Sequence, residues 1–181
     1  MIKKIQKIGV FFGIILAINI ANQYVYKRFD ITSDKRFTLS ETTKNILSDI
    51  KKPLYITIYL EGDFPSEFKR LQTETRQFLE ELSAENSNIK IHFENPDEQR
   101  EELIKKGMMP SQLTVQEEGK FSEAIIFPWA EINFEDKTTL VSLLPNAIAT
   151  SQEQQLEKAI ENLSYSFSNA IHSISQKKSK N

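Results

Sequence analysis

An uncharged apolar run near the amino terminus constrains this chain more than any other feature. It extends from Ile8 to Tyr26, reads IGVFFGIILAINIANQYVY, and contains no Asp, Glu, Lys or Arg. At about 1.5 Å of rise per helical residue, this stretch comes close to the roughly 30 Å hydrocarbon thickness of a bilayer. We therefore expect residues 8–26 to cross the membrane once, in contact with lipid.

Basic residues on both sides of the run bear on its orientation. Lys3, Lys4 and Lys7 precede it, and the positive-inside rule places them in the cytoplasm, although Lys27 and Arg28 on the other side reduce the asymmetry. This predicts a cytoplasmic start and anchor at residues 1–27, with the main domain outside the cytoplasm. A cleaved signal peptide is the alternative, but the sequence AINIANQ lacks a clear small-x-small cleavage pattern, which favours an uncleaved anchor.

The remainder of the chain is mildly acidic and has no cysteine. The 23 basic and 25 acidic residues nearly balance, but without the three lysines before residue 9 there are 20 basic residues against 25 acidic ones. Nucleic acid requires a basic protein face, so this balance argues against a nucleic-acid partner. The absence of cysteine excludes disulfides, thiolate metal sites and dithiol redox chemistry.

Residues 28–53 read as a juxtamembrane segment with a short amphipathic helix. Thr38 and Glu41 have the spacing of a capping box, and apolar residues then recur on one helical face, which predicts a helix from about Leu39 to Lys52. We expect this capped helix to hold the globular domain close to the bilayer in a defined orientation.

Residues 54–176 are expected to form the globular domain, followed by a basic tail at 177–181. Alternating β-branched and aromatic residues predict strands at Leu54–Leu60 and Ile89–Phe93, and three-to-four spacing predicts a long helix between them. Strand, helix and strand in this order make a βαβ unit with parallel strands.

The second half of this domain has a different pattern of predicted elements. A helix from Asp97 to Lys106 should end at the cap residue Gly107. Antiparallel strands are expected after it, interrupted at Pro128 and turned at Asp136 and Lys137. A final helix should run from about residue 151 to residue 175.

This order, β-α-β, α, β-β, α, is the order of a thioredoxin-like fold, an α/β fold with a mixed sheet flanked by helices. Pro110, just before the third main strand, falls where thioredoxins carry a proline next to the active site. The redox pair of such a fold would lie in the segment GDFPSE, which has no cysteine, so the fold does not bring redox activity with it.

Two loops and one tryptophan are the candidate interaction residues. Glu61 and Asp63 flank a glycine at the carboxyl end of a strand, where α/β folds often place ligands, although an acidic helix start that complements the helix dipole is the favoured interpretation. The full candidate set is Glu61, Gly62, Asp63, Phe64, Pro65, Met108, Met109, Pro110 and Trp129.

No motif predicts catalysis. His92 and His172 are isolated and lack the spacing of metal ligands, and a chain with five glycines shows no phosphate-binding loop. We therefore expect no catalytic residues, no metal and no cofactor.

Four segments closely resemble one family of bacterial proteins. RFDITSDKRFTLSETT, YLEGDFPSEFKRLQTETRQFLEEL, ENPDE and LTVQEEGKFSEAIIFPWAEINF are similar to the amino-terminal part of the gliding-motility accessory proteins of the GldG family. The resemblance implies a subunit anchored in the inner membrane, with its main domain in the periplasm, that works beside the permease and the separate ATPase of an ABC transporter. Members of that family continue into a second domain and a carboxyl-terminal membrane helix, so we expect this chain, which stops at Asn181, to be a fragment or a truncated form, or its remainder to be supplied separately.

The sequence thus predicts a non-enzymatic accessory subunit of an ABC transporter that acts through protein–protein contacts. The alternative is an extracytoplasmic module that captures a small molecule or envelope polymer for the permease with the loops at 61–65 and 108–110. An enzyme is the third possibility, for which a cluster of converging polar groups would be needed.

Overall fold

The computed structural model describes residues 38–62, 66–117, 120–144 and 151–176. The predicted membrane segment at 8–26 and the basic tail at 177–181 lie outside these ranges. Within the described ranges, every helix is too short or too polar to cross a bilayer.

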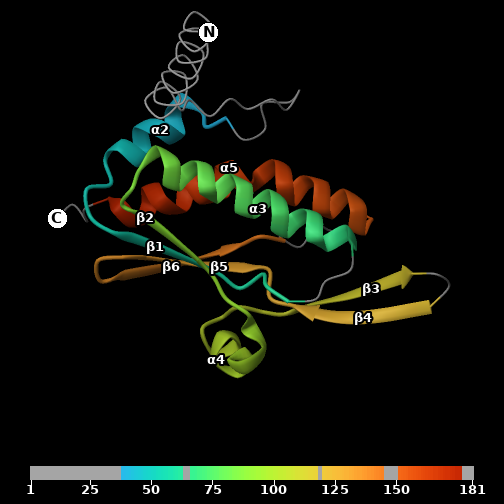
Figure 1. Cartoon of the computed structure of the whole chain (residues 1–181). Helices are drawn as coiled ribbons and strands as arrows, with labels where there is room; N and C mark the ends of the chain where they lie inside the picture. Colours follow the sequence, from blue (N-terminus) through green and yellow to red (C-terminus); the bar gives the residue numbers. More distant parts are fainter. Residues whose placement is uncertain (1–37, 63–65, 118–119, 145–150, 177–181) are drawn as a thin grey trace, which may run out of the picture. The chain divides into compact units, whose positions relative to one another are not determined.

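A four-stranded mixed sheet forms the centre of the fold (Figure 1). Its strand order is β2-β1-β5-β6, where β1 is parallel to β2 and antiparallel to β5, and β5 is antiparallel to β6. The bounds are Leu54–Ile58 for β1, Ile89–Phe93 for β2, Trp129–Phe134 for β5 and Lys137–Ser142 for β6. The predicted mixed sheet and the parallel βαβ unit are therefore confirmed.

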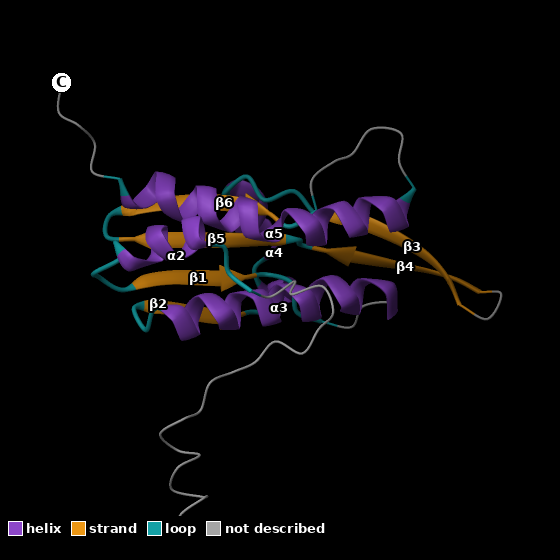
Figure 2. Cartoon of the chain, turned by 90° about the horizontal axis from the view of Figure 1, so that it is seen from above, coloured by secondary structure: helices purple, strands orange, loops and turns teal. Residues whose placement is uncertain are grey.

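Three helices cover one face of this sheet, and a short helix lies on the other (Figures 1 and 2). The covering helices are α2 (Glu41–Ser48), α3 (Ser66–Glu85) and α5 (Gln152–Ser175), and the helix on the opposite face is α4 (Arg100–Lys105). The main core lies under the three helices because strand alternation sends Leu54, Ile56 and Ile58 to that side, where all are fully buried.

The helical stripes predicted from sequence pack into this core. The stripe of α5 is buried along its length, and the rings of Phe78 in α3 and Phe167 in α5 lie 5.8 Å apart between centroids. The buried members of the α5 stripe are Leu156, Ile160, Leu163, Phe167, Ile171 and Ile174.

The start of α2 differs from the prediction. Ser40 is the N-cap, and its hydroxyl oxygen accepts a 3.1 Å hydrogen bond from the backbone N–H of Thr43. Because Thr38 then lies two residues outside the cap, the predicted Thr38–Glu41 capping box is wrong. The helix also ends at Ser48, so the predicted span was too long.

Hydrogen bonds hold α2 to the domain at both ends. The Thr43 side chain is 2% exposed, and its hydroxyl lies 3.0 Å from that of Ser168 in α5. At the other end, the Asn86 side chain donates to the carbonyl oxygens of Leu47 and Ile50 at 2.6 and 3.0 Å. Since these contacts satisfy orphan carbonyls at the helix end, α2 packs as an integral part of the domain.

The predicted helix from Asp97 to Lys106 is two shorter elements, the 3₁₀ turn η1 (Pro96–Glu98) and α4. Gly107 is confirmed as the cap. It has φ +96°, its N–H donates to Ile104 at 2.9 Å, and the next N–H, from Met108, donates to Leu103 at 3.0 Å. This pair of bonds is a Schellman motif, which requires a residue that tolerates positive φ.

A separate hairpin precedes the second half of the sheet. β3 (Ser111–Glu117) and β4 (Lys120–Ile126) pair only with each other among the described strands, and they extend beyond the end of the central sheet (Figures 1 and 2). The expected role of Pro110 is therefore wrong, because Pro110 leads into this hairpin and Pro128 precedes β5. The turn between β5 and β6 lies at Glu135 and Asp136, one residue earlier than predicted, and Glu135 has φ +55°.

Candidate functional site

Three chain segments meet where β1 ends and β5 begins. Tyr59 follows β1, and its backbone N–H donates to the carbonyl oxygen of Trp129 at 2.9 Å. The indole Nε1 of Trp129 in turn donates to the carbonyl oxygen of Met109 at 2.8 Å. These bonds fix the loop after α4 against the start of β5 and bring together the predicted residues Met109, Pro110 and Trp129.

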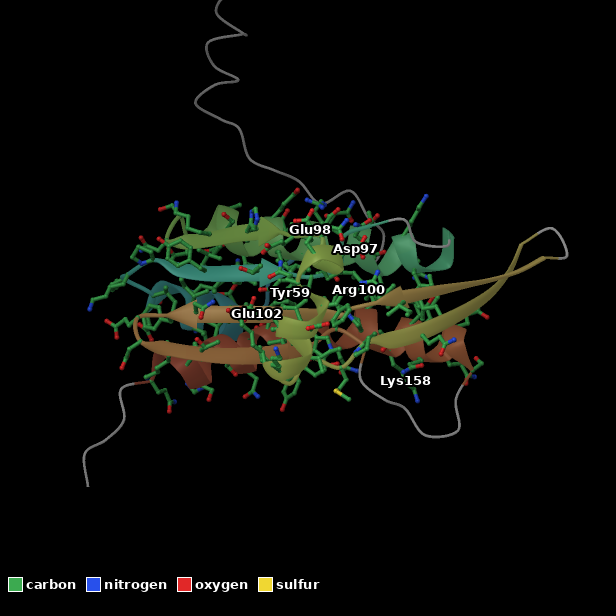
Figure 3. All side chains as sticks on the ribbon, turned by 90° about the horizontal axis from the view of Figure 1, so that it is seen from below. Tyr59, Asp97, Glu98, Arg100, Glu102 and Lys158 are labelled. Carbon is green, nitrogen blue, oxygen red and sulfur yellow. The ribbon has the colours of Figure 1, made fainter. Side chains whose placement is uncertain are left out.

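A second apolar cluster lies on the α4 side of the sheet. Its buried members are Tyr59, Leu103, Met108 and Phe127, with Trp129 and Leu140 partly buried beside them. Strand alternation directs Tyr59 away from the main core, and Figure 3 shows it on the same side as α4. Met108, predicted as an interaction residue, belongs to this cluster and is fully buried. It supports the site but cannot be a contact residue.

Next to this cluster, apolar side chains are exposed. Met109 is 63% exposed, Ile104 in the last turn of α4 is 43% exposed, and Ile125 of β4 is 53% exposed. Ile125 pairs with Gln112, two residues after Pro110, so register places it at the base of the same hairpin. We call this set the Met109 surface: Ile104, Met109, Pro110, Ile125 and Trp129.

Sequence reasoning missed Ile104 and Ile125. Strand alternation is a signal that could have identified Ile125. Its neighbours Ala124 and Ile126, partly buried and buried, point to one face of the strand, so Ile125 points to the opposite face. Ile104 follows the buried Leu103 in a one-and-a-half-turn helix, which is too short for periodicity to show which of two adjacent residues is exposed.

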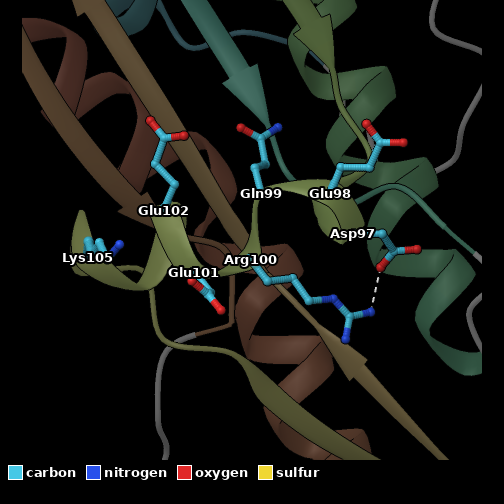
Figure 4. A pocket seen from close by; sticks show the side chains of 7 residues that line it. All are labelled: Asp97, Glu98, Gln99, Arg100, Glu101, Glu102 and Lys105. Atoms are coloured by element: carbon cyan, nitrogen blue, oxygen red, sulfur yellow. Dashed lines mark hydrogen bonds and ion pairs between the residues drawn. The ribbon is translucent and has the colours of Figure 1, made fainter.

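The surroundings of α4 are acidic. An open depression of about 550 Å³ is lined by Asp97, Glu98, Gln99, Arg100, Glu101, Glu102 and Lys105. All seven residues come from one continuous segment, and Figure 4 shows their side chains pointing in different directions, with Arg100 turned back to its ion-pair partner Asp97. With four carboxylates and two cations, this edge is negatively charged. Its side chains do not converge on one point, as the groups of a catalytic site would.

Two titratable groups under α4 have shifted pKa values, both upward. The hydrogen bond from Lys106 to Glu131, at 3.0 Å, raises the pKa of that lysine. Burial, and then the charge of Glu131, raise the pKa of Tyr59. Because general acids and bases work best with pKa values near the operating pH, both shifts move these groups away from acid–base chemistry at neutral pH.

The other predicted loop is only partly described. Asp63, Phe64 and Pro65 lie outside the described residues, whereas Glu61 forms an ion pair with Arg76 of α3. The guanidinium carbon of Arg76 lies 3.7 Å from the centroid of the Phe93 ring. Glu61 is thus part of a structural cluster that ties β1 to α3 and β2, and Gly62 beside it has φ +136°.

The described residues contain no group of three or more His, Asp or Glu side chains placed to hold a metal ion. His92 is exposed on β2, and His172 lies 3.0 Å from the side-chain amide of Gln176 at the end of α5.

Comparison with protein families identifies the family of this chain. A family model described as a domain of unknown function (DUF7088) matches residues 33–133, which is more than half of the 181-residue chain. This range includes α2 and extends almost to the end of β5. No curated protein and no solved structure matches the chain.

Proposed function

The chain belongs to the DUF7088 family, and we propose that it is a non-enzymatic accessory subunit of an ABC transporter, anchored by residues 8–26 and acting through the Met109 surface. The resemblance to the gliding-motility accessory proteins supports the link to a permease and, through it, to a separate ATPase. The apolar run supports the inner-membrane location with the domain in the periplasm.

We also propose a thioredoxin-like architecture for the described domain. If the hairpin β3–β4 is an insertion, and α2 and the 3₁₀ turn η1 are set aside, the remaining elements are β1, α3, β2, α4, β5, β6 and α5. Their order is the β-α-β, α, β-β, α order expected of that fold, with α4 on the opposite face from α3 and α5 (Figure 1).

The single observation that carries the functional proposal is the exposure of Met109 beside Trp129. Methionine side chains are flexible and polarizable, which suits contact surfaces, and tryptophan is enriched among residues that dominate interface energy. Both are held on a rigid base, because the indole–carbonyl hydrogen bond and the buried cluster under α4 fix the backbone that presents them. Such an arrangement reduces the entropic cost of binding.

The charge around this surface indicates the chemistry of the partner segment. The apolar side chains adjoin the acidic edge of α4, where carboxylates outnumber cations. We expect the contacting segment of the permease to be apolar at its centre and basic at its rim, since opposite charges steer association.

Co-purification from native membranes tests this proposal. Met109→Glu adds a charge to the centre of the surface and should strongly reduce recovery of the permease. Tyr165→Glu is the matched control, because Tyr165 is 72% exposed on α5 and lies on a different element. Equal recovery of the permease with both variants would refute the proposed surface, and recovery with neither variant nor the wild type would refute the transporter assignment.

A further inference from the structure

β6 is an edge of the central sheet without the usual protection of an edge strand. Among the described strands it pairs only with β5 (Figure 2). Edge strands usually carry a lysine, a proline or a bulge that prevents pairing with another chain. The opposite edge, β2, carries the exposed Lys90. From Thr138 to Ser142, by contrast, β6 has no charge and no proline, and its register with β5 is continuous.

The one charged residue of β6 is held by its own chain. The Nζ of Lys137 donates to the carbonyl oxygens of Ile174 and Gln176 at 3.0 and 2.6 Å. The ammonium group therefore lies against the end of α5. The rest of the strand, from Thr138 to Ser142, forms an uncharged edge.

The β5–β6 turn determines which backbone groups this edge presents. Phe134 and Lys137, on either side of the two-residue turn, are a hydrogen-bonded pair, and such pairs recur at every second position. The 2.8 Å bond from the N–H of Leu143 to the carbonyl oxygen of Pro128 falls in the same series. The residues between these positions direct their backbone N–H and C=O groups away from β5, and they are Thr138, Leu140 and Ser142.

The sequence of this edge is complementary to itself. Two antiparallel copies of β6, with Leu140 of each on a two-fold axis, can form hydrogen bonds through the outward backbone groups. In this register Thr138 faces Ser142 of the second copy, and Thr139 faces Val141 of the second copy. Hydroxyl residues meet in the first pair, β-branched residues in the second and leucines on the axis, and no like charges are opposed.

The helix above β6 has an uncharged side over the same edge. α5 packs on β6 and β5, and its opposite side is marked by Ser168, which bonds to Thr43 of α2 (Figure 2). Helical spacing places the glutamates of α5 and Lys158 away from the β6 edge. The side over the edge carries Gln155, Ala159, Asn162, Ser166 and Ser173.

We propose that two copies of this chain associate through β6, as an antiparallel strand pair that joins their central sheets into one. The two α5 helices lie side by side over the joint, where their uncharged side chains allow close approach. The interface is isologous, since both copies contribute the same residues. None of these residues belongs to the Met109 surface, and the inference does not depend on the transporter assignment.

Sedimentation velocity of the full chain in detergent tests the proposal. The wild type should sediment as a dimer. Leu140→Lys places two ammonium groups on the axis and should weaken the dimer about tenfold or more, because like charges directly opposite each other destabilise a strand pair. Tyr165→Lys adds the same charge to an exposed residue of α5 and should leave the dimer intact.

Introduced thiols test the register, because the chain has no cysteine of its own. When differently tagged Thr138→Cys and Ser142→Cys chains are mixed and oxidised, a disulfide should join them, since the two facing Cα atoms would lie about 5.5 Å apart. Neither variant alone should form this link, because each residue would lie about 14 Å along the strand from its counterpart in the second copy.

These outcomes are decisive in both directions. A monomeric wild type, an unchanged dimer in Leu140→Lys, or the absence of the mixed disulfide would overturn the proposal. So would a Thr138→Cys disulfide with itself that forms as fast as the mixed one, or a photocrosslinker at position 138 that captures only a different membrane protein. If Leu140→Lys does not fold, the mixed disulfide still decides, because both cysteine replacements are small.

Discussion

The indole Nε1 of Trp129 donates a 2.8 Å hydrogen bond to the carbonyl oxygen of Met109. Twenty residues separate the two along the chain, and the bond joins the loop after α4 to the first residue of β5. Trp129→Phe keeps the aromatic packing but leaves this carbonyl without its donor. We expect a loss of about 1 kcal/mol in the free energy of unfolding, measured by urea denaturation.

That variant should also loosen the Met109 loop. Amide exchange at residues 108–110 should accelerate in Trp129→Phe more than exchange in the centre of α5. Unchanged exchange at these amides would show that the hydrogen bond does not hold the loop.

The Thr43 hydroxyl links α2 to α5 through Ser168. Thr43→Val preserves the shape of a 2% exposed side chain and removes its hydrogen bonds, so we expect a destabilisation of about 1–2 kcal/mol and faster exchange of α2 amides. Thr42→Val makes the same chemical change at the adjacent exposed residue and should have little effect. Equal effects of the two variants would mean that helix propensity, and not the link to α5, determines the outcome.

Alkaline pH should weaken the Lys106–Glu131 contact. The raised pKa of Lys106 means that the contribution of this pair is fully present below the unfolded value of 10.5 and is lost as pH rises through the higher folded value. The raised pKa of Tyr59 acts in the same direction, because its ionised form is disfavoured by burial and then by Glu131. The melting temperatures of the wild type and Glu131→Gln should therefore converge as pH increases beyond this range.

Glu157→Gln is the control for this titration. Glu157 pairs with Arg70 across α3 and α5, and arginine stays protonated throughout the range. Its difference from the wild type should stay constant with pH. A difference for Glu131→Gln that is equally constant would contradict the assigned cause of the Lys106 shift.

Substitution of Gly107 should lower the stability of the protein because of the backbone conformation of this residue, and not because neighbouring atoms leave no room for a side chain. A Cβ added there would meet nothing within 4 Å, but φ is +96°. Gly107→Ala should cost about 1–2 kcal/mol, and Gly107→Asn should cost less because asparagine tolerates positive φ better. Chemical denaturation of both variants measures this order, and an alanine variant as stable as the wild type would show that the Schellman turn can rearrange.

Most of the fold follows from local patterns. Alternation identifies β1 and β2, and helical spacing identifies α3 and α5. The structure adds a capping box of Ser151 with Gln154 at the start of α5. These elements are long or strongly periodic, so the pattern outweighs local ambiguity.

The errors arise where two residues compete for one role. Thr38 and Ser40 can both cap a helix, and the structure has Ser40 as the cap of α2, next to the contact between Thr43 and Ser168, which lie 125 residues apart. Pro110 and Pro128 both precede strands, and only the pairing of β5 with β1 shows which strand joins the central sheet. Such choices depend on tertiary contacts that a local pattern does not contain.

Only part of the candidate site was predicted, because the exposure of its residues also depends on tertiary contacts. Met109, Pro110 and Trp129 do meet, but Met108 is buried because the Schellman turn directs it under α4. Tyr55 gives a strong strand signal, but the 55% exposure of its side chain depends on tertiary packing that the local pattern does not contain.

Site-specific photocrosslinking in native membranes tests the central claim most directly. A photoreactive residue at position 109 should form an adduct with the permease of an ABC transporter, and the same residue at position 165, on the exposed side of α5, should not. An adduct of equal yield at both positions, or no adduct with a membrane protein at position 109, would contradict the account.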